Sequence, residues 1–509
     1  METLLSALDT VITPINIMWI AIGVTLGYVV GVIPGLGKGT AVAVAIPLTF
    51  YIPPVPAIAF LIGIAKGSTA GSAVSAILLN APGEASSAPT ALDGYPLARQ
   101  GKAQKALKMG LFASVIGDFC ATVVLIVLAQ PLAEYALAIG PVELFAILCF
   151  SLTFIAGLSG TSLTRGLIAG FFGLLVATVG TEVETAALRF TFDSLELYDG
   201  LSIVPVAIGM LATSEMMIQM GNQRKLDAET NLLNKGTTRE DKTILWSEWK
   251  ACFPSIFRGT LIGSAVGILP GLGASVASFL SYGAAKRAAD DPDRFGKGAL
   301  EGVAAAESAD NAVVPSSLVP LFAIGIPGSV IAAILIGAFI VQGVTPGPLM
   351  FTQQKELVYG IYLSMLGASL LLLIIGYFGQ SVFAQVVRVP MRYVVPVVLF
   401  FCSMGAYLQG NGVFGVGIML FFGVLGFFAR KLDFGFVTFL IGFVIGPSFE
   451  LTLRQTIALT GGEMSGLLSH PVALVFFAMT AIAAWRIVVR QRQKLRKETQ
   501  VNDATQPAK

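Results

Sequence analysis

Long apolar runs constrain this chain more than any other feature of its sequence. Many reach about 20 residues, the length of an α-helix that crosses the roughly 30 Å hydrocarbon core of a bilayer. Such runs are too long for barrel strands, and only helices or closed barrels satisfy backbone polar groups inside lipid. Charged residues make up 12% of the 509 residues and the mean hydropathy is +0.80, whereas soluble domains carry about 25% charged residues. The sequence therefore predicts an all-α polytopic membrane protein and excludes a soluble enzyme, a disordered chain and a fibre.

Apolar segments occur along the whole chain. They lie at residues 15–33, 41–66, 68–92, 106–129, 142–157, 162–180, 200–220, 252–285, 304–343, 357–378, 393–409, 413–428, 434–449 and 471–489. Several are too short or too long for one span, or are interrupted by Pro-Gly. We expect about 12 transmembrane segments, some of them broken or re-entrant.

Charge and residue counts exclude further classes of function. The formal net charge of +2 gives the chain no nucleic-acid signature. The four cysteines, Cys120, Cys149, Cys252 and Cys402, show no C-x-x-C spacing, and His470 is the one histidine. This argues against metal clusters, disulfide frameworks and catalytic triads. We expect no enzyme activity, metal or cofactor, apart from a coupling Na⁺ or H⁺.

Basic residues are concentrated in one set of polar segments. Of the 32 Lys and Arg residues, 26 lie in residues 93–108, 158–165, 221–250, 286–300, 379–392, 429–433 and from 486 onward. The opposite set, 1–14, 130–141, 181–199, 344–356 and 450–470, holds Arg189, Lys355 and Arg454. The positive-inside rule then predicts a multi-pass protein with its N-terminus outside and its C-terminus in the cytoplasm. The sequence METLLSALDT lacks the basic region of a signal peptide, so we expect the first apolar run to be retained.

A motif occurs twice. Residues 31–37 read GVIPGLG and residues 267–273 read GILPGLG, an offset of 236 residues. Each copy is followed by a second Pro-Gly in apolar sequence, Pro82-Gly83 after 48 residues and Pro327-Gly328 after 57. The nine additional residues fit the polar insert Asp290–Gly298.

The charges next to each copy predict that the copies are inverted. The loop after the first, DGYPLARQGKAQKALK, has four basic residues, and the loop after the second, TPGPLMFTQQKE, has one. The first is therefore expected inside and the second outside. Inverted-topology repeats with broken helices are typical of secondary transporters.

Helices interrupted in this way predict an anion site. Pro and Gly end a helix and leave backbone groups that only protein or a watery cavity can satisfy. New helices are expected after Gly37, Gly83, Gly273 and Gly328, and a helix N-terminus presents free N–H groups and partial positive charge. Converging ends would bind one anionic ligand. The alternative is that these Pro-Gly pairs are ordinary kinks or packing contacts.

The candidate site residues follow from these breaks. The substrate-binding candidates are Pro34, Gly35, Gly37, Lys38, Lys66, Ser72, Asn80, Pro82, Gly83, Ser86, Ser87, Pro270, Gly271, Gly273, Ser275, Asn311, Pro327, Gly328 and Ser329. The candidates for ion or proton coupling are Glu84, Glu307 and Asp310. Hydroxyl and small residues among them also suit close helix packing.

The charged candidates are the most informative because intramembrane charges are costly. Lys38 directly follows PGLG, where a cation opposes the helix dipole, so stability alone is a poor reason for it. Lys38 and Lys66 are expected to bind a substrate carboxylate, the alternative being snorkelling to an interface. Glu84 is either a helix-start acid or a coupling group. Glu307 and Asp310, three residues apart, are suited to sharing a proton or holding a cation, the alternative being a solvated helix face.

These features divide the chain into successive parts. We expect an external N-terminus at 1–14, a first repeat at 15–129, scaffold helices at 130–220, a cytoplasmic loop at 221–250, a second repeat at 251–378, scaffold helices at 379–489 and a basic, disordered cytoplasmic tail at 490–509. In the outer segment 450–470, Glu450 and Arg454 are four apart and predict an ion pair.

Several longer motifs carry a family resemblance. They are GVIPGLG, AILLNAPGEASSAPTALDGYPLARQGKA, GILPGLGASVASFLSYGAAKR, FGKGALEGVAAAESADNA and FGVLGFFARKLDF, in this order. With them the chain resembles the large membrane subunit of tripartite tricarboxylate transporters, the TctA family. In that family small or aromatic residues are usual at the positions of Lys38 and Lys66, and Asn is usual where Asp310 stands.

The resemblance implies a function. It implies a permease of the bacterial inner membrane that takes up a citrate-like or other carboxylate, driven by a sodium or proton gradient. It also implies two partners, a small TctB-like membrane subunit and an extracytoplasmic TctC-like solute-binding protein. A self-sufficient carboxylate transporter without a binding protein is the alternative. An intramembrane enzyme would need a nucleophile and base or a catalytic carboxylate pair, for which Glu307 and Asp310 are the one nearby acidic pair.

Overall fold

The computed structural model describes residues 2–158, 163–182, 184–221, 238–269, 272–386, 389–486 and 489. In this part of the chain, nine helices are long and apolar enough to cross a membrane. Shorter apolar helices lie at Lys38–Thr49, Pro141–Thr153, Thr164–Ala177, Val330–Val341 and Pro471–Arg486. The predicted all-α polytopic class is confirmed. The predicted loop 221–250 is described only at its two ends, and the predicted tail 490–509 lies outside the described residues.

The chain forms two compact units. One comprises Met1–Ala136 and Ser202–Phe427, and the other comprises Leu137–Leu201 and Phe428–Lys509. Both predicted repeats, 15–129 and 251–378, lie in the first unit. The predicted scaffold segments 130–220 and 379–489 are divided between the two units.

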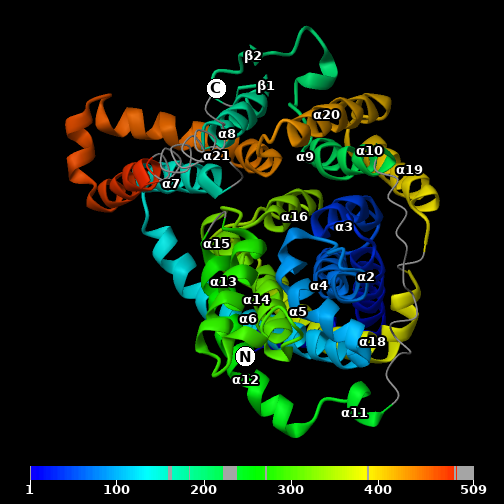
Figure 1. Ribbon diagram of the computed structural model, residues 1–509. Coiled ribbons are helices and arrows are strands. Elements are labelled where there is room, and N and C mark those ends of the chain that lie inside the picture. The colour runs from blue at the N-terminus through cyan, green and yellow to red at the C-terminus, as the bar shows by residue number, and fades with distance from the viewer. Residues whose placement is uncertain are drawn as a thin grey trace, which may run out of the picture. The chain divides into compact units, whose positions relative to one another are not determined.

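The first unit is helical (Figure 1). Its N-terminal elements are α1 (Glu2–Val11), α2 (Pro14–Val32), α3 (Lys38–Ala45), η1 (Ile46–Thr49), α4 (Pro54–Leu79), η2 (Ala85–Ser87), α5 (Ala88–Leu97), η3 (Ala98–Lys102) and α6 (Ala103–Leu137). After residue 202 follow α9 (Ile203–Ala207), η5 (Ile208–Thr213), α10 (Ser214–Gly221), α11 (Arg239–Lys242), α12 (Trp246–Ile268), α13 (Gly273–Ala288), η7 (Pro292–Arg294), α14 (Leu300–Ser316), α15 (Leu318–Ile324), α16 (Val330–Val341), α17 (Met350–Gln353), α18 (Lys355–Val386), α19 (Met391–Gln409) and α20 (Val413–Lys431).

The second unit packs α7 (Pro141–Leu158), α8 (Leu163–Ala177) and α21 (Phe436–Thr460) against one another. It also contains η4 (Leu195–Leu197), η8 (Met464–Ser469) and a hairpin of β1 (Gly180–Thr181) with β2 (Leu188–Arg189), antiparallel with Gly180 opposite Arg189. Glu450 accepts hydrogen bonds from Arg454 at 3.0 Å and from Arg189 at 2.6 and 3.1 Å. The predicted pair of Glu450 and Arg454 is confirmed, and Arg189 joins it.

Helix α4 is enclosed by protein. Residues 56–78 are all buried, and α2, α5, α14 and α18 pack against it. The helix is mostly apolar and rich in Gly, Ala and Ser, a composition typical of a helix buried on every side and closely approached by its neighbours. The polar groups of α4 therefore have to be satisfied by protein rather than by lipid headgroups.

Backbone contact sets the distance between α2 and α4, which lie side by side (Figure 1). Three glycines of α2, four residues apart, each face a backbone carbonyl oxygen of α4. The pairs are Gly23 with Phe60, Gly27 with Ile64 and Gly31 with Ser68. A Cβ atom at these glycines would lie 2.1–2.3 Å from the oxygen, so no side chain fits there.

Helices α12 and α14 repeat this contact. The pairs are Gly259 with Ala305, Gly263 with Ala309 and Gly267 with Val313, with distances of 2.4–3.0 Å from an added Cβ to the carbonyl oxygen. Each glycine follows its counterpart by 236 residues, the offset of the two PGLG motifs, and each carbonyl residue follows by 245, the offset of the second Pro-Gly pairs. The two helix pairs are therefore packed alike, residue for residue.

The helices end where Pro-Gly predicts. Helix α2 ends at Val32, and the turn at Pro34 and Gly35, whose φ is +86°, leads into α3 at Lys38. Helix α4 ends at Leu79 and is followed by Asn80 (φ 52°) before Pro82-Gly83, and α15 ends at Ile324 and is followed by Gly325 (φ 74°) before Pro327-Gly328. These two left-handed residues are again 245 positions apart. Pro270 and Gly271 lie outside the described residues, but Gly273 begins α13.

The glycine contact makes a stability prediction. We expect Gly27→Ala to lower the thermal midpoint of the purified protein in detergent, by an amount equivalent to about 1–3 kcal/mol, because its Cβ overlaps the Ile64 carbonyl oxygen. Gly367→Ala in α18 is the control, because a Cβ there meets nothing within 4 Å. Equal midpoints for the two variants would contradict the packing described.

Candidate functional site

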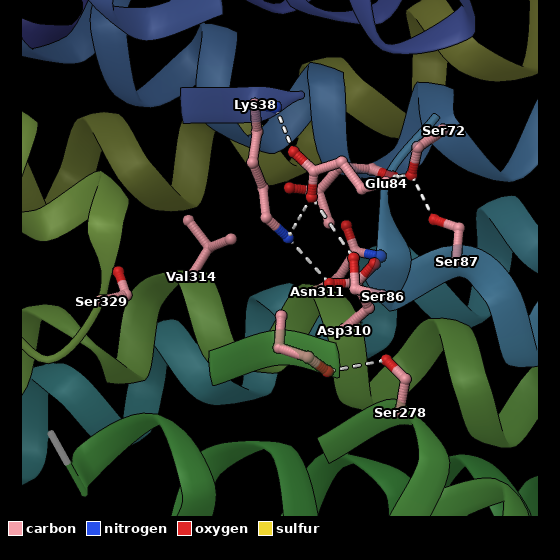
Figure 2. A network of polar contacts seen from close by, with 12 residues as sticks. Lys38, Ser72, Glu84, Ser86, Ser87, Ser278, Asp310, Asn311, Val314 and Ser329 are labelled. Atoms are coloured by element: carbon pink, nitrogen blue, oxygen red, sulfur yellow. Dashed lines mark hydrogen bonds and ion pairs between the residues drawn. The ribbon is translucent and has the colours of Figure 1, made fainter. Parts of the chain in front are cut away.

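Lys38 links three segments of the chain that are distant in sequence. It is the first residue of α3, and its Nζ lies 2.8 Å from Asp310 Oδ1 on α14 and 3.2 Å from Glu84 Oε2, just after the second Pro-Gly (Figure 2). The Lys38 side chain is 11% exposed, that of Glu84 16% and that of Asp310 1%. Sequence analysis predicted all three as site residues, and the structure brings them together.

Glu84 also caps helix α3. Its Oε1 accepts a hydrogen bond from the backbone N–H of Lys38, and its Oε2 accepts one from the Ser86 hydroxyl at 3.3 Å. A carboxylate there stabilises the partial positive charge of the helix N-terminus. A Cβ at Gly37 would lie 3.0 Å from Oε1, so a side chain at this position would crowd the carboxylate. The predicted anion site at the start of α3 is thus occupied by the protein's own carboxylate.

Glu307 lies one helical turn from Asp310 on α14 and is fully buried. Its carboxylate accepts hydrogen bonds from Thr90 at 2.6 Å, Ser114 at 3.0 Å and the Asn311 amide at 3.4 Å. Among the described residues it has no cationic partner within 4.0 Å. The cluster therefore holds three carboxylates, those of Glu84, Glu307 and Asp310, and one ammonium group.

Two serine pairs support the breaks. Ser72 contacts Ser87 at 2.5 Å between hydroxyl oxygens, and Ser329 donates to Ser317 at 2.9 Å while it caps α16 through the N–H of Ala332. Ser72 and Ser317 are 245 residues apart. At two of the breaks predicted to bind substrate, serine hydroxyls therefore form hydrogen bonds with serines of another segment.

The glycines after each second proline are also packing positions. A Cβ at Gly83 would lie 2.8 Å from the Gly31 carbonyl oxygen, and one at Gly328 would lie 3.0 Å from that of Gly267. Gly31 and Gly267 are the first residues of the two GxxPGLG motifs. The first and second breaks of each copy therefore touch through their backbones.

Some predicted residues do not join the Lys38 cluster. Asn80 is exposed at the end of α4, and Ser275 makes no side-chain hydrogen bond to another described residue. Gly35 lies against the side chains of Gln219 and Glu215 of α10. Their placement supports the alternative that part of each motif serves packing and turns.

Lys66 is the main departure from the predicted site. Its Nζ lies 2.8 Å from Asp118 Oδ2, 3.2 Å from Thr122 Oγ1, 2.7 Å from the Met365 carbonyl and 3.0 Å from Ser369 Oγ. The side chain is 0% exposed, and these oxygens use all three of its N–H donors. In this conformation no donor of Lys66 remains for a substrate carboxylate, which supports a structural role for this lysine.

Asp93 is a residue that sequence reasoning missed. It is fully buried on α5, and its Oδ1 accepts backbone N–H bonds from Gly296, Gly298 and Ala299 at 2.8–2.9 Å, while Tyr282 donates to Oδ2 at 2.9 Å. Hydrogen bonds therefore connect the predicted insert 290–298 to α5, the helix that follows Pro82-Gly83. The sequence did not reveal this role because Asp93 begins a basic segment that was predicted to be a loop, where an acidic residue is expected to be solvated.

Ser114 was also missed. It is an isolated serine in the largely apolar helix α6, and such a serine in the sequence does not differ from an ordinary packing residue. The structure shows it bonded to both Glu307 and Asn311.

A cavity of about 570 Å³ opens beside the insert. Its lining includes four basic and four acidic side chains, among them Lys105, which pairs with Glu248 at 2.6 Å. Because the acidic and basic side chains balance, the cavity does not favour binding of an anion. It is therefore not assigned as the substrate site.

Comparison with known proteins gives a consistent picture. The chain matches the model of the "Tripartite tricarboxylate transporter TctA family" over residues 17–441. It is 36% identical over 473 residues, 92% of this chain and 93% of the relative, to an "Uncharacterized 52.8 kDa protein in TAR-I ttuC' 3'region" of Agrobacterium vitis. It is 38% identical over 211 residues, 42% of this chain and 87% of the relative, to an "Uncharacterized protein in TAR-II ttuC' 3'region" of the same organism. No solved structure matches.

The ion pair of Lys66 predicts a large effect on stability. Lys66→Met leaves the Asp118 carboxylate buried without its cation, which is expected to cost about 3–5 kcal/mol. Adding Asp118→Asn should recover most of this loss, because the neutral amide needs no counter-charge. The thermal midpoints of wild type, single and double variants measure the effect, and a double variant no more stable than Lys66→Met would contradict it.

Proposed function

Because the chain belongs to the tripartite tricarboxylate transporter TctA family, we propose that it is the large permease subunit of such a system in the bacterial inner membrane. It imports an organic carboxylate, citrate-like or another acid. An extracytoplasmic TctC-like binding protein delivers the substrate, and a small TctB-like subunit completes the transporter. The observation that carries the proposal is the position of Lys38, an ammonium group at the start of a half-length helix inside an apolar unit.

The chemistry of this position suits a carboxylate. A charged ammonium and a backbone N–H at a helix N-terminus are both strong donors to an anionic oxygen. Asp310 holds the Lys38 ammonium from the buried side, so the cation is fixed before a substrate arrives. The Ser86 hydroxyl, which donates to Glu84, is a further donor at this position.

The two helix pairs that pack alike support two repeats within one chain. We propose that the repeats are inverted relative to each other and that the whole chain has about 12 spans. The offsets of 236 and 245 residues that relate the Pro-Gly motifs also relate the residues in contact within the two helix pairs. In the proposed mechanism, the repeats carry the breaks, and the substrate site alternates between the two sides of the membrane. The N-terminus is outside and the C-terminus in the cytoplasm.

The carboxylate cluster supports coupling to a cation. The cluster holds three carboxylates and one ammonium group, which contacts Glu84 and Asp310, and burying uncompensated charge in an apolar unit is costly. A proton or a sodium ion taken up with the substrate removes this imbalance. Glu307, which is held by neutral donors alone among the described residues, is the proposed coupling group.

Uptake into proteoliposomes tests the function. We expect the purified chain, with its small subunit and binding protein, to accumulate one member of a panel of radiolabelled di- and tricarboxylates under an imposed sodium or proton gradient. Lys38→Met should lower uptake at least tenfold with normal membrane insertion, and Lys355→Met, at an exposed lysine, should retain it. Uptake without the binding protein would favour the self-sufficient transporter, and no uptake of any acid would overturn the proposal.

Labelling of cysteines tests the proposed inversion. Gln100 and Gln353 are both exposed, and they follow the second Pro-Gly of the first and second repeat. In a background without the four native cysteines, we expect Gln100→Cys to react with a membrane-impermeant maleimide only from the cytoplasmic side and Gln353→Cys only from the outside. Reaction of both from one side would contradict an inverted repeat.

A further inference from the structure

Glu84 occupies the position that a substrate carboxylate needs. Both of its oxygens are engaged at the start of α3, Oε1 by the Lys38 N–H and Oε2 by the Lys38 ammonium at 3.2 Å and the Ser86 hydroxyl at 3.3 Å. A helix N–H, an ammonium and a hydroxyl are the donors that recognise an external carboxylate. The same donors cannot serve two carboxylates at once.

We propose that Glu84 is an internal competitor for the substrate: its carboxylate fills a carboxylate subsite at Lys38 in the free protein, leaves when one carboxylate of the substrate binds, and returns to expel that carboxylate on release. This inference rests on the proposed function and names Glu84 as a residue that sets affinity and release.

The two carboxylates on Lys38 are not equivalent. The Asp310 side chain is 1% exposed, whereas that of Glu84 is 16% exposed. Asp310 is held within helix α14, but Glu84 lies outside any helix, with extended backbone (φ −135°, ψ 159°) just after Pro82-Gly83. Glu84 can therefore turn away without breaking helical hydrogen bonds, while Asp310 keeps the ammonium in place.

A second observation points to a ligand at this place. The other carboxylate oxygen of Asp310, Oδ2, is buried and has no hydrogen-bond partner among the described residues. Buried carboxylate oxygens are normally satisfied. A donor that arrives with the substrate, such as the hydroxyl of a hydroxy acid or a proton, would satisfy it.

Lys38 is the cationic partner of Glu84, because the other cations on the segments packed around η2 are engaged elsewhere or lie far along their helix. The segments α4, α5, α13 and α14 pack against η2, which follows Glu84. On α4, Lys66 is engaged by Asp118, and on α5, Asp93 is engaged by the insert. On α13, Lys286 and Arg287 lie in the last turn, far along the helix from Gly273. Helix α14 contributes the acids Glu301, Glu307 and Asp310, so a displaced Glu84 meets no second cation there.

Substrate binding and transport give the first test. For the acid that wild type accumulates best, Glu84→Gln should lower the dissociation constant about tenfold or more, because a neutral amide competes less for the Lys38 donors. The same variant should transport more slowly, because release lacks the returning charge. Weaker binding by Glu84→Gln would show that Glu84 only positions Lys38 and would overturn the inference.

Chemical rescue gives a second test that needs no transported substrate. Glu84→Ala should lose thermal stability, and acetate, compared with chloride at equal ionic strength, should restore it by several degrees by filling the vacated subsite. Asp310→Ala is the matched control, since it removes the other carboxylate from Lys38 at a position that is not exposed, and acetate should not restore it.

The outcomes separate the two proposals. Failure of acetate to stabilise Glu84→Ala more than wild type would overturn the inference while uptake by the wild type still supports the function. Rescue by acetate in a protein that accumulates no acid would overturn the proposed function and leave only a carboxylate subsite, without a role in transport.

Discussion

Contact between backbones at glycine faces is the constraint on which the rest of this structure depends. Helices in lipid gain little from hydrophobic association, so close packing of small residues has to hold them together. The pair α2 and α4 meets where a side chain on Gly23, Gly27 or Gly31 would overlap a carbonyl oxygen. The last glycine of this face begins GVIPGLG, and its carbonyl oxygen supports Gly83 of the second break. The packing face and the candidate site are therefore one continuous feature, and the second copy repeats it at Gly267 and Gly328.

The buried charges of the first unit are compensated in two different ways. Lys66 is surrounded by a carboxylate, a carbonyl and two hydroxyls, which leaves it a satisfied structural cation. Lys38 is shared by Glu84 and Asp310, and Glu307 adds a further acid one turn away. A saturated ion pair suits a fixed part of a protein, whereas an excess of carboxylates next to a buried ammonium group suits a site that takes up and releases charge.

Much of the candidate site was predictable because proline and glycine act locally. Their effect on the backbone does not depend on distant residues, so the breaks near Pro34, Pro82 and Pro327 lie where they are expected. Lys38, Glu84 and Asp310 were predicted as site residues from their positions next to these breaks or on the polar helix after the second motif. Lys66 looked the same in sequence, since an intramembrane lysine gives no sign of whether an acid on another helix already engages it.

The sequence by itself determined the all-helical membrane class, the places where helices break and the residue types available there, because hydropathy and backbone chemistry are properties of short segments. Only the tertiary structure decided which charges meet. The contact of Lys38 with Asp310 spans 272 positions, and Asp93 binds an insert about 200 residues later. The reason is physical: a buried charge is defined by its neighbours in space, and those neighbours are selected by how helices pack, which no single segment specifies.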